Sequence, residues 1–327
     1  MVRVLLTFAR AIAALALVLF FASAPPARSQ ISAVPPGAAA SVPTTPPTRT
    51  QTARTTITQA HPALWKVTGS KGTVYLLGSI HVLAPQMRWR TREIDAALKA
   101  ADVFVFEIPM DASQKADVQA FIKENGMLPP GTALPSLLDE QTRQDYVAAL
   151  NATHVSPELL TPMRPWLALL MLNAGVVSQQ RLSIDAGLDR QIYALALKKR
   201  GVTFRALETP DQQLKLLMPE DKSLELQEFD AGLKDLLKET LSIDELIDAW
   251  AQGDMKKLND LMNSGFKDNP KAEKLLFEDR NRAWVGKIEK MLAERHIFFI
   301  TVGAGHLTGP KGVPALLRAE GYRVAGP

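Results

Sequence analysis

Apolar residues along this chain form short strand-like runs that alternate with longer segments of helical period. The short runs predict a hairpin and then isolated strands, at 64–67, 73–77, 103–108, 202–207, 297–302 and 322–324. The helical periods predict helices at 91–100, 111–124, 135–150, 156–160, 165–178, 184–200, 272–295 and 313–320, and a helical, heavily charged region over 210–265 that includes a helix at 224–241. Alternation of strand and helix is typical of parallel crossover units. The pattern therefore predicts an α/β fold with a central, largely parallel sheet and flanking helices.

Two of the predicted strands end in the same motif. The run that reaches Leu77 continues as Gly78-Ser-Ile-His81, and the run that reaches Val302 continues as Gly303-Ala-Gly-His306. A single Gly-x-x-His is weak evidence, but here two of five histidines follow buried strands in this way. Ligands of open α/β sheets bind beyond the carboxyl ends of the strands, so we expect both histidines in one pocket.

Two acidic residues stand at the ends of other predicted strands. Glu107 lies in the apolar run 103–108, and Glu208 follows the run 202–207. A buried carboxylate must pair with a cation, bind a metal or stay protonated. For Glu107 the alternative is a strand-end side chain that reaches solvent or a single arginine.

Three further polar residues lie beside apolar helix faces. Asp189 is next to the stripe of the helix predicted over 184–200, where a surface position is equally compatible with the pattern. Asn281 lies on the apolar face of the last long helix, with Arg280 at its edge. A polar residue on such a face needs a buried partner, so both are candidates to support the site, with a capping or packing role as the alternative.

The strand ends thus predict a cluster of two imidazoles and one or two carboxylates. Such a set could hold a divalent metal with open positions, or act without metal as general base and acid on a bound water. The sequence contains no Gly-x-Ser-x-Gly, His-Glu-x-x-His, phosphate-loop or dinucleotide motif. It also contains no cysteine, which excludes disulfides, thiolate chemistry and a lipid-modified cysteine.

The N-terminal sixty residues differ from the rest. Residues 1–29 read as a signal peptide for export to the periplasm or the medium, with Arg3 and Arg10 before an apolar segment that ends in small residues. An uncleaved signal would leave a membrane tether, although the apolar run is shorter than the ~20 residues of a spanning helix. Residues 30–60 are rich in Pro, Ala and Thr and read as a disordered linker before one domain, 61–327.

Charge distribution argues against nucleic acid as a partner. The formal net charge is +4, but residues 1–60 contain five arginines and no acid. The remaining residues carry 33 basic and 34 acidic side chains, without a basic stripe. The predicted domain is therefore close to neutral.

Seven segments together resemble the TraB/GumN family, which includes the Tiki-type membrane metalloproteases and is related more distantly to erythromycin esterases and ChaN-like haem-binding lipoproteins. They are Leu64-Trp-Lys-Val67, the segment 74–83, Arg164-Pro-Trp166, Gly187-Leu-Asp189, Leu207-Glu-Thr209, Arg280-Asn-Arg-Ala-Trp284 and Val302-Gly-Ala-Gly-His-Leu307. The resemblance covers nearly all of 61–327 and implies an α/β fold with helical insertions.

The resemblance also implies roles for single residues. His81, Glu107 and His306 would form the centre and hold a divalent metal such as manganese or cobalt. Asp189, Glu208, Arg280 and Asn281 match family positions and are further catalytic candidates. The esterase branch implies instead a histidine base that needs no metal.

Two classes of function follow. The favoured hypothesis is an exported hydrolase, a metal-dependent peptidase with the two Gly-x-x-His motifs and a glutamate, acting on a peptide or small-molecule substrate. The alternatives are a haem- or metal-binding protein without catalysis and a metal-independent esterase.

Overall fold

A computed structural model describes residues 58–179, 182–219, 221–238, 243–264, 266 and 270–327. Six strands form one sheet in the order β4-β3-β5-β2-β1-β6. The strands are β1 (Leu64–Thr68), β2 (Thr73–Ser79), β3 (Val103–Phe106), β4 (Thr203–Ala206), β5 (Ile297–Gly303) and β6 (Arg323–Ala325). The four strands β4, β3, β5 and β2 run parallel, whereas β1 is antiparallel to both β2 and β6. The predicted α/β fold with a largely parallel sheet is confirmed.

Helices follow or separate the strands as the sequence predicts. They are α2 (Arg92–Ala100), α3 (Ala112–Asn125), η1 (Leu134–Leu137), α4 (Glu140–Thr153), α5 (Pro157–Leu160), α6 (Pro165–Ser178), α7 (Leu188–Ala196), α8 (Pro210–Lys215), η2 (Lys222–Leu224), α9 (Glu225–Lys238), α10 (Ile243–Ala251), α11 (Met255–Ser264), α12 (Pro270–Glu273), a π-helix (Lys274–Glu278), α13 (Asp279–Leu292), η4 (Ala304–Leu307) and α14 (Val313–Ala319).

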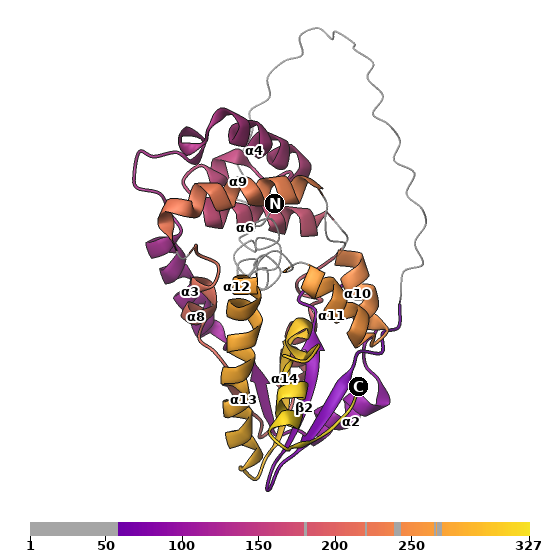
Figure 1. Cartoon of the computed structure of the whole chain (residues 1–327). Coiled ribbons are helices and arrows are strands. Elements are labelled where there is room, and N and C mark those ends of the chain that lie inside the picture. The colour runs from indigo at the N-terminus through magenta and orange to yellow at the C-terminus, as the bar shows by residue number, and fades with distance from the viewer. Residues whose placement is uncertain (1–57, 180–181, 220, 239–242, 265, 267–269) are drawn as a thin grey trace, which may run out of the picture.

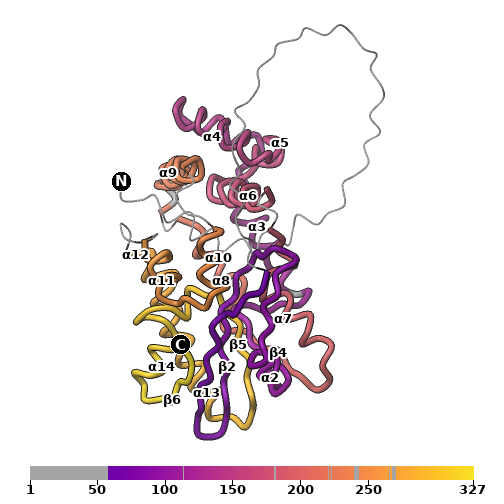
Figure 2. Tube along the Cα trace, turned by 90° about the vertical axis from the view of Figure 1, so that its right-hand side faces the viewer, coloured from indigo at the N-terminus to yellow at the C-terminus, as the bar shows by residue number. Residues whose placement is uncertain are grey.

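Helices cover both faces of the sheet. On one face α13 and α14 bury Trp284, Ile288 and Leu317 against alternate residues of the strands. On the other face α2, α7 and α10 pack over side chains that include Leu77 and Phe299. Figure 2 shows α13 and α14 on one side of the strands and α2 and α7 on the other. Strands buried on both faces explain why their sequences are continuous apolar runs.

A helical unit stands beyond the carboxyl ends of the strands, with α4, α6 and α9 stacked above the sheet in Figure 1. Its cores are apolar clusters of their own, and α6 is buried on nearly all sides because its sequence is apolar all round. A buried ion pair joins the start of α6 to the start of α9, with NH2 of Arg164 2.5 Å from Oε2 of Glu225.

Several predicted boundaries move for identifiable reasons. β3 ends at Phe106, so Glu107 is the first residue beyond the strand instead of a member of it. The helix predicted from 184 begins at Leu188, because Ser183 pairs with Leu83 and Gly187 occupies the N-cap. The helix predicted over 272–295 is interrupted by the π-helix.

The packed structure includes a residue just before the predicted domain start at 61. Ala60 is fully buried, and its N–H donates to the carbonyl of Arg88 at 2.6 Å. The predicted signal peptide and the linker as far as residue 57 lie outside the described residues, as do residues 239–241 at the end of one predicted helix. Among the helices that the structure does describe, none combines the length and apolarity needed to cross a membrane.

Asp235 in α9 supplies a test of stability against pH. It is buried, neither carboxylate oxygen has a hydrogen-bond partner among the described residues, and burial raises its pKa to about 7 against a small opposing effect of Lys238. The folded state therefore binds a proton that the unfolded state, with a pKa near 3.8, has lost. This acid costs the folded protein stability as the pH rises from about 4 to about 7.

We expect Asp235→Asn to remove that loss. Its advantage over the wild type in unfolding free energy should grow with pH over this interval by about 4 kcal/mol and then level off. Urea unfolding at several pH values measures it, with Asp117→Asn on an exposed position of α3 as the control. Equal pH profiles for wild type and Asp235→Asn would contradict the expectation.

Candidate active site

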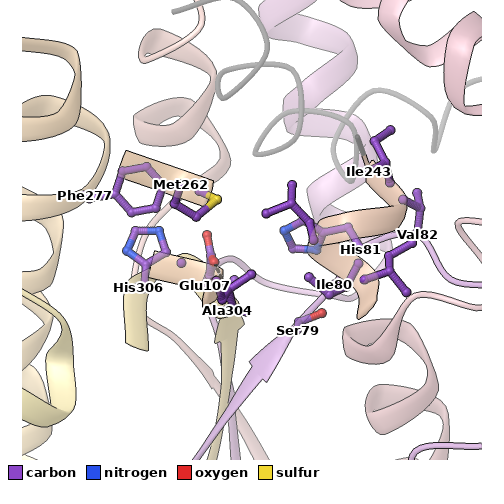
Figure 3. Close-up of a pocket in the computed structure, with 15 residues that line it drawn as sticks. Ser79, Ile80, His81, Val82, Glu107, Ile243, Met262, Phe277, Ala304 and His306 are labelled. Carbon is purple, nitrogen blue, oxygen red and sulfur yellow. Dashed lines mark hydrogen bonds between the residues drawn. The ribbon is translucent and has the colours of Figure 1, made fainter. Parts of the chain in front are cut away.

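Four parallel strands bring their carboxyl ends to one edge of the sheet. Ser79 lies opposite Gly303 in the β2–β5 ladder, and Phe106 lies opposite Thr301 in the β3–β5 ladder. The residues that follow each strand are therefore neighbours in space, although the chain separates them widely. His81, Glu107 and His306 line one cavity of about 80 Å³ at this edge (Figure 3).

The position above Gly303 locates where these side chains converge. A Cβ built on Gly303 would lie 3.2 Å from Oε1 of Glu107, 3.6 Å from Cδ2 of His306 and 3.9 Å from Nε2 of His81. Glycine leaves this position free, so a small group there would touch all three side chains. The two Gly-x-x-His motifs thus share one pocket, as the sequence predicts.

Gly78, in the other motif, is needed because the backbone of η4 passes close to it. It lies inside β2, and a Cβ there would meet Cα of Ala304 at 2.9 Å. Glycine therefore lets η4 approach the neighbouring strand closely. This approach brings the segment that carries His306 against the end of β2.

His81 forms a pair with Asp189. Nδ1 of His81 lies 3.3 Å from Oδ1 of Asp189, which also accepts a hydrogen bond from Oγ of Ser79 at 3.0 Å. Although the two atoms are close, Nδ1 of His81 does not form a hydrogen bond with this oxygen. Burial lowers the pKa of His81, but the charge and close contact of Asp189 and the charge of Glu107 together outweigh burial, and the pKa is raised above 6.5. Asp189 points inward and is not a surface aspartate.

The segment Gly187-Leu-Asp189 is built to reach this histidine. A Cβ on Gly187 would lie 2.3 Å from the carbonyl oxygen of His81, so only glycine allows the start of α7 to come so close. The N–H of Leu188 donates to the carbonyl of Ile80 at 3.1 Å. These contacts fix Asp189 beside the imidazole.

His306 has a different environment. Its ring lies between Phe277 and Trp284, with ring centroids 4.8 and 4.3 Å away. Nδ1 lies 2.6 Å from Oδ1 of Asn281, whose Nδ2 donates to the carbonyl of Lys311, so the amide oxygen faces the ring. Nδ1 therefore carries the proton, and Nε2 accepts from Arg280.

The surroundings keep His306 neutral. Burial and the neighbouring charge of Arg280 lower its pKa to about 3. Both ring nitrogens have a hydrogen-bond partner, since NH1 of Arg280 lies 3.0 Å from Nε2. His306 therefore orients Arg280 and has no free nitrogen with which to accept a proton.

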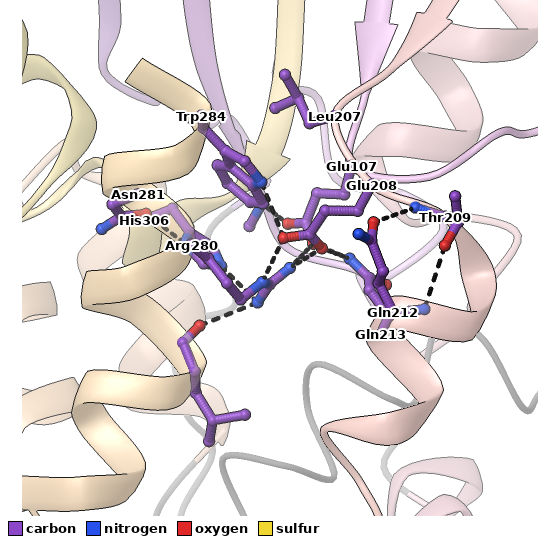
Figure 4. A network of polar contacts seen from close by, with 12 residues as sticks. Glu107, Leu207, Glu208, Thr209, Gln212, Gln213, Arg280, Asn281, Trp284 and His306 are labelled. Carbon is purple, nitrogen blue, oxygen red and sulfur yellow. Dashed lines mark hydrogen bonds and ion pairs between the residues drawn. The ribbon is translucent and has the colours of Figure 1, made fainter. Parts of the chain in front are cut away.

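Arg280 connects the remaining polar residues (Figure 4). Nε and NH2 donate to the two oxygens of Glu208, both at 2.8 Å, and NH2 also donates to Oε2 of Glu107 at 2.8 Å. NH1 donates to the carbonyl of Leu276 at 3.0 Å and to His306. All five N–H groups of the guanidinium are thus engaged.

Glu107 is ionised in this network. Burial alone would raise its pKa, but the charge of Arg280 and a hydrogen bond from the N–H of Gly303 at 2.6 Å hold it at about 2. Of the alternatives that the sequence leaves open, the structure selects pairing with a buried cation. Oε1 remains at the cavity wall, close to the point above Gly303.

All seven predicted residues are therefore brought together in two connected groups, one around His81 and one around Arg280. Sequence reasoning missed Gln213, whose Nε2 donates to Glu107 at 2.6 Å and to Glu208 at 3.1 Å. Trp284 also joins this network, because its Nε1 donates to Oε1 of Glu208 at 2.9 Å. The sequence gives only a weak signal for Gln213, which is a polar residue five positions after Glu208 in a segment of helical character.

The predicted divalent metal does not fit these residues as they lie. A metal held by His81, Glu107 and His306 needs Nε2 of His306, and that atom is bound to a guanidinium. Arg280 already supplies the positive charge that the carboxylates require. Within the described ranges no group of three or more His, Asp or Glu side chains is arranged to hold a metal ion.

Haem does not fit the cavity either. About 80 Å³ is well below the roughly 300 Å³ at which pockets for drug-sized ligands begin. Nε2 of His306, the atom that would have to bind the haem iron, is also occupied by Arg280. The cavity suits a small group beside His81 and Glu107.

The buried pair of Glu107 and Arg280 can be tested by Glu107→Gln. A glutamine has one acceptor oxygen and one donor NH2, so it cannot accept from Gly303 on one side and from Arg280 and Gln213 on the other. We expect a loss of about 3 kcal/mol in unfolding free energy, the low end for a broken buried pair because Glu208 still binds Arg280.

Glu294→Gln is the matched control, because Glu294 pairs with Arg205 in an exposed position. It should cost less than about 1 kcal/mol in the same urea titration. Unchanged or increased stability of Glu107→Gln would show that the guanidinium does not depend on this carboxylate.

Comparison with known proteins places the chain in a family. Residues 63–325 match the model of the TraB/PrgY/gumN family. An uncharacterized protein of Treponema pallidum (strain Nichols) is 19% identical over 265 residues, which cover 78% of this chain and 79% of that protein. No solved structure matches. The chain belongs to the TraB/PrgY/gumN family.

Proposed function

We propose that this protein is an exported hydrolase that cleaves an ester or amide bond without a metal, with His81 as the general base. The observation that carries the proposal is the orientation of His81, whose Nδ1 faces Asp189 while Nε2 faces the cavity opposite Glu107. Export rests on the signal peptide predicted in residues 1–29. The substrate is a peptide or a small molecule.

The proton transfers follow from the two faces of the imidazole. Nε2 takes a proton from a water held above Gly303, and the hydroxide attacks the carbonyl carbon of the substrate. Asp189 beside Nδ1 stabilises the resulting imidazolium, which then returns the proton to the leaving group. Bond breaking thus leaves His81 neutral again.

Glu107 and Arg280 act on position and charge. Oε1 of Glu107 already accepts from Gly303 and can accept one hydrogen of the attacking water, which turns a lone pair toward the carbonyl. Arg280 has no spare N–H for a substrate, so it holds Glu107 in place and keeps it ionised. His306, Asn281 and Glu208 fix Arg280.

His81→Gln tests the base. We expect the rate of hydrolysis to fall by ~10²–10⁴, the range typical of a lost general base, with little change in melting temperature. The assay uses a panel of p-nitrophenyl esters and fluorogenic peptide amides.

His296→Gln is the control for this substitution. His296 is half exposed at the other end of β5, where it pairs with Asp102. This variant should retain wild-type rates. A rate of His81→Gln equal to that of the wild type would remove His81 from the mechanism.

Metal dependence separates this proposal from the metal-dependent peptidase implied by the resemblance. We expect purified protein treated with EDTA to keep its hydrolytic rate, and added manganese, cobalt or zinc to raise it less than twofold. The measurement is the initial rate with the best substrate of the panel, with metal content determined in parallel. Loss of activity in EDTA and recovery with one metal would contradict the metal-free mechanism with His81 as the general base.

A further inference from the structure

The cavity beside His81 has one polar wall and one apolar wall. The ends of the strands supply the polar wall with His81, Glu107 and His306. The opposite wall comes from α10 and α11, and in Figure 3 Ile243 and Met262 lie across the space from the strand ends. Every residue that these two helices contribute to the lining is aliphatic or methionine.

From this division we infer that the apolar wall is a subsite for a short, uncharged aliphatic group attached to the scissile carbonyl. The inference rests on the proposed function, because it assumes that a carbonyl carbon lies beside His81 and Glu107. It adds the class of substrate: esters or amides of a short aliphatic acid, or peptides with a small apolar side chain at the cleaved bond.

The spacing of the apolar residues places them on the helix faces that line the cavity. Ile243, Leu246 and Ile247 are spaced for one face of α10, and Leu258 and Met262 are one turn apart on α11. Their side chains leave space in front of the catalytic atoms, where close packing would normally fill it. An apolar group of the substrate is the occupant that such a lining favours.

The size and charge of the cavity restrict which groups can bind in it. The cavity of about 80 Å³ is smaller than the ~150 Å³ apolar cavity that holds benzene, and it must also admit the carbonyl. A group of a few carbons fits, and a long acyl chain does not. An anionic group would face Glu107, which is ionised and offers only acceptor oxygens here.

Met262 sets the depth of the subsite. It lines this cavity and also a second, more polar cavity of about 230 Å³ behind Phe277 and Gly305. Shortening this side chain therefore opens the short subsite toward additional space. Met171 on α6 is a half-buried methionine in the helical unit, remote from the cavity lining, and provides a matched control.

The first experiment compares p-nitrophenyl acetate, butyrate, octanoate and hemisuccinate in wild type, Met262→Ala and Met171→Ala. We expect the wild type to prefer butyrate in kcat/KM over octanoate and over the anionic hemisuccinate. Met262→Ala should raise the octanoate-to-butyrate ratio at least tenfold, and Met171→Ala should leave it unchanged. A wild-type preference for octanoate or hemisuccinate, or no change of the ratio in Met262→Ala, would overturn the subsite while leaving hydrolysis established.

The second experiment does not depend on hydrolysis. Acetone, 2-pentanone and 2-nonanone carry the carbonyl but no bond that water can cleave, and ligand-observed NMR measures their binding to the full chain. We expect 2-pentanone to bind tightest to the wild type and 2-nonanone to gain at least tenfold in Met262→Ala. That result in a protein that cleaves no ester or amide would uphold the subsite and overturn the hydrolase, whereas no ketone binding would overturn the subsite.

Discussion

The site depends on one buried cation, the guanidinium of Arg280, which is held by two carboxylates and one imidazole. Its side chain is 8% exposed, and those of Glu107 and Glu208 are 13% and 10% exposed. A buried charge is tolerated only when its partners satisfy it, and here each N–H has an acceptor. Because Glu107, Glu208 and His306 follow β3, β4 and β5, Arg280 links the ends of these three strands.

This constraint explains the local structure around it. The π-helix directly precedes the first residues of α13, and the carbonyl of Leu276 within it accepts from NH1 of Arg280. Phe277, on the same turn, contacts the ring of His306 in a tilted arrangement. The π-helical turn thus provides two contacts of the site, and such turns are frequent at functional positions.

Much of the fold could be read from the chain because its signals are local. Buried strands give continuous apolar runs, and Gly-x-x-His after two of them marks the edge where strand ends meet. The partners of Glu107 could not be read, because Arg280 and Gln213 lie 173 and 106 residues away and reach it only through packing. The sequence therefore indicated a site that needs a cation, and a metal was a reasonable expectation until the structure placed an arginine there.

The same motif gives its two histidines opposite properties because different helices cover them. His306 lies between aromatic rings beside a cation, which disfavours a second proton. His81 faces Asp189, and three carboxylates of the site stand against one guanidinium, so a proton on His81 reduces an excess of negative charge. The pKa of His81 is raised for this reason, and an imidazolium formed during a reaction would be stabilised there. Proton transfer is therefore favoured at one histidine, and the other is left to hold the cation that makes the arrangement stable.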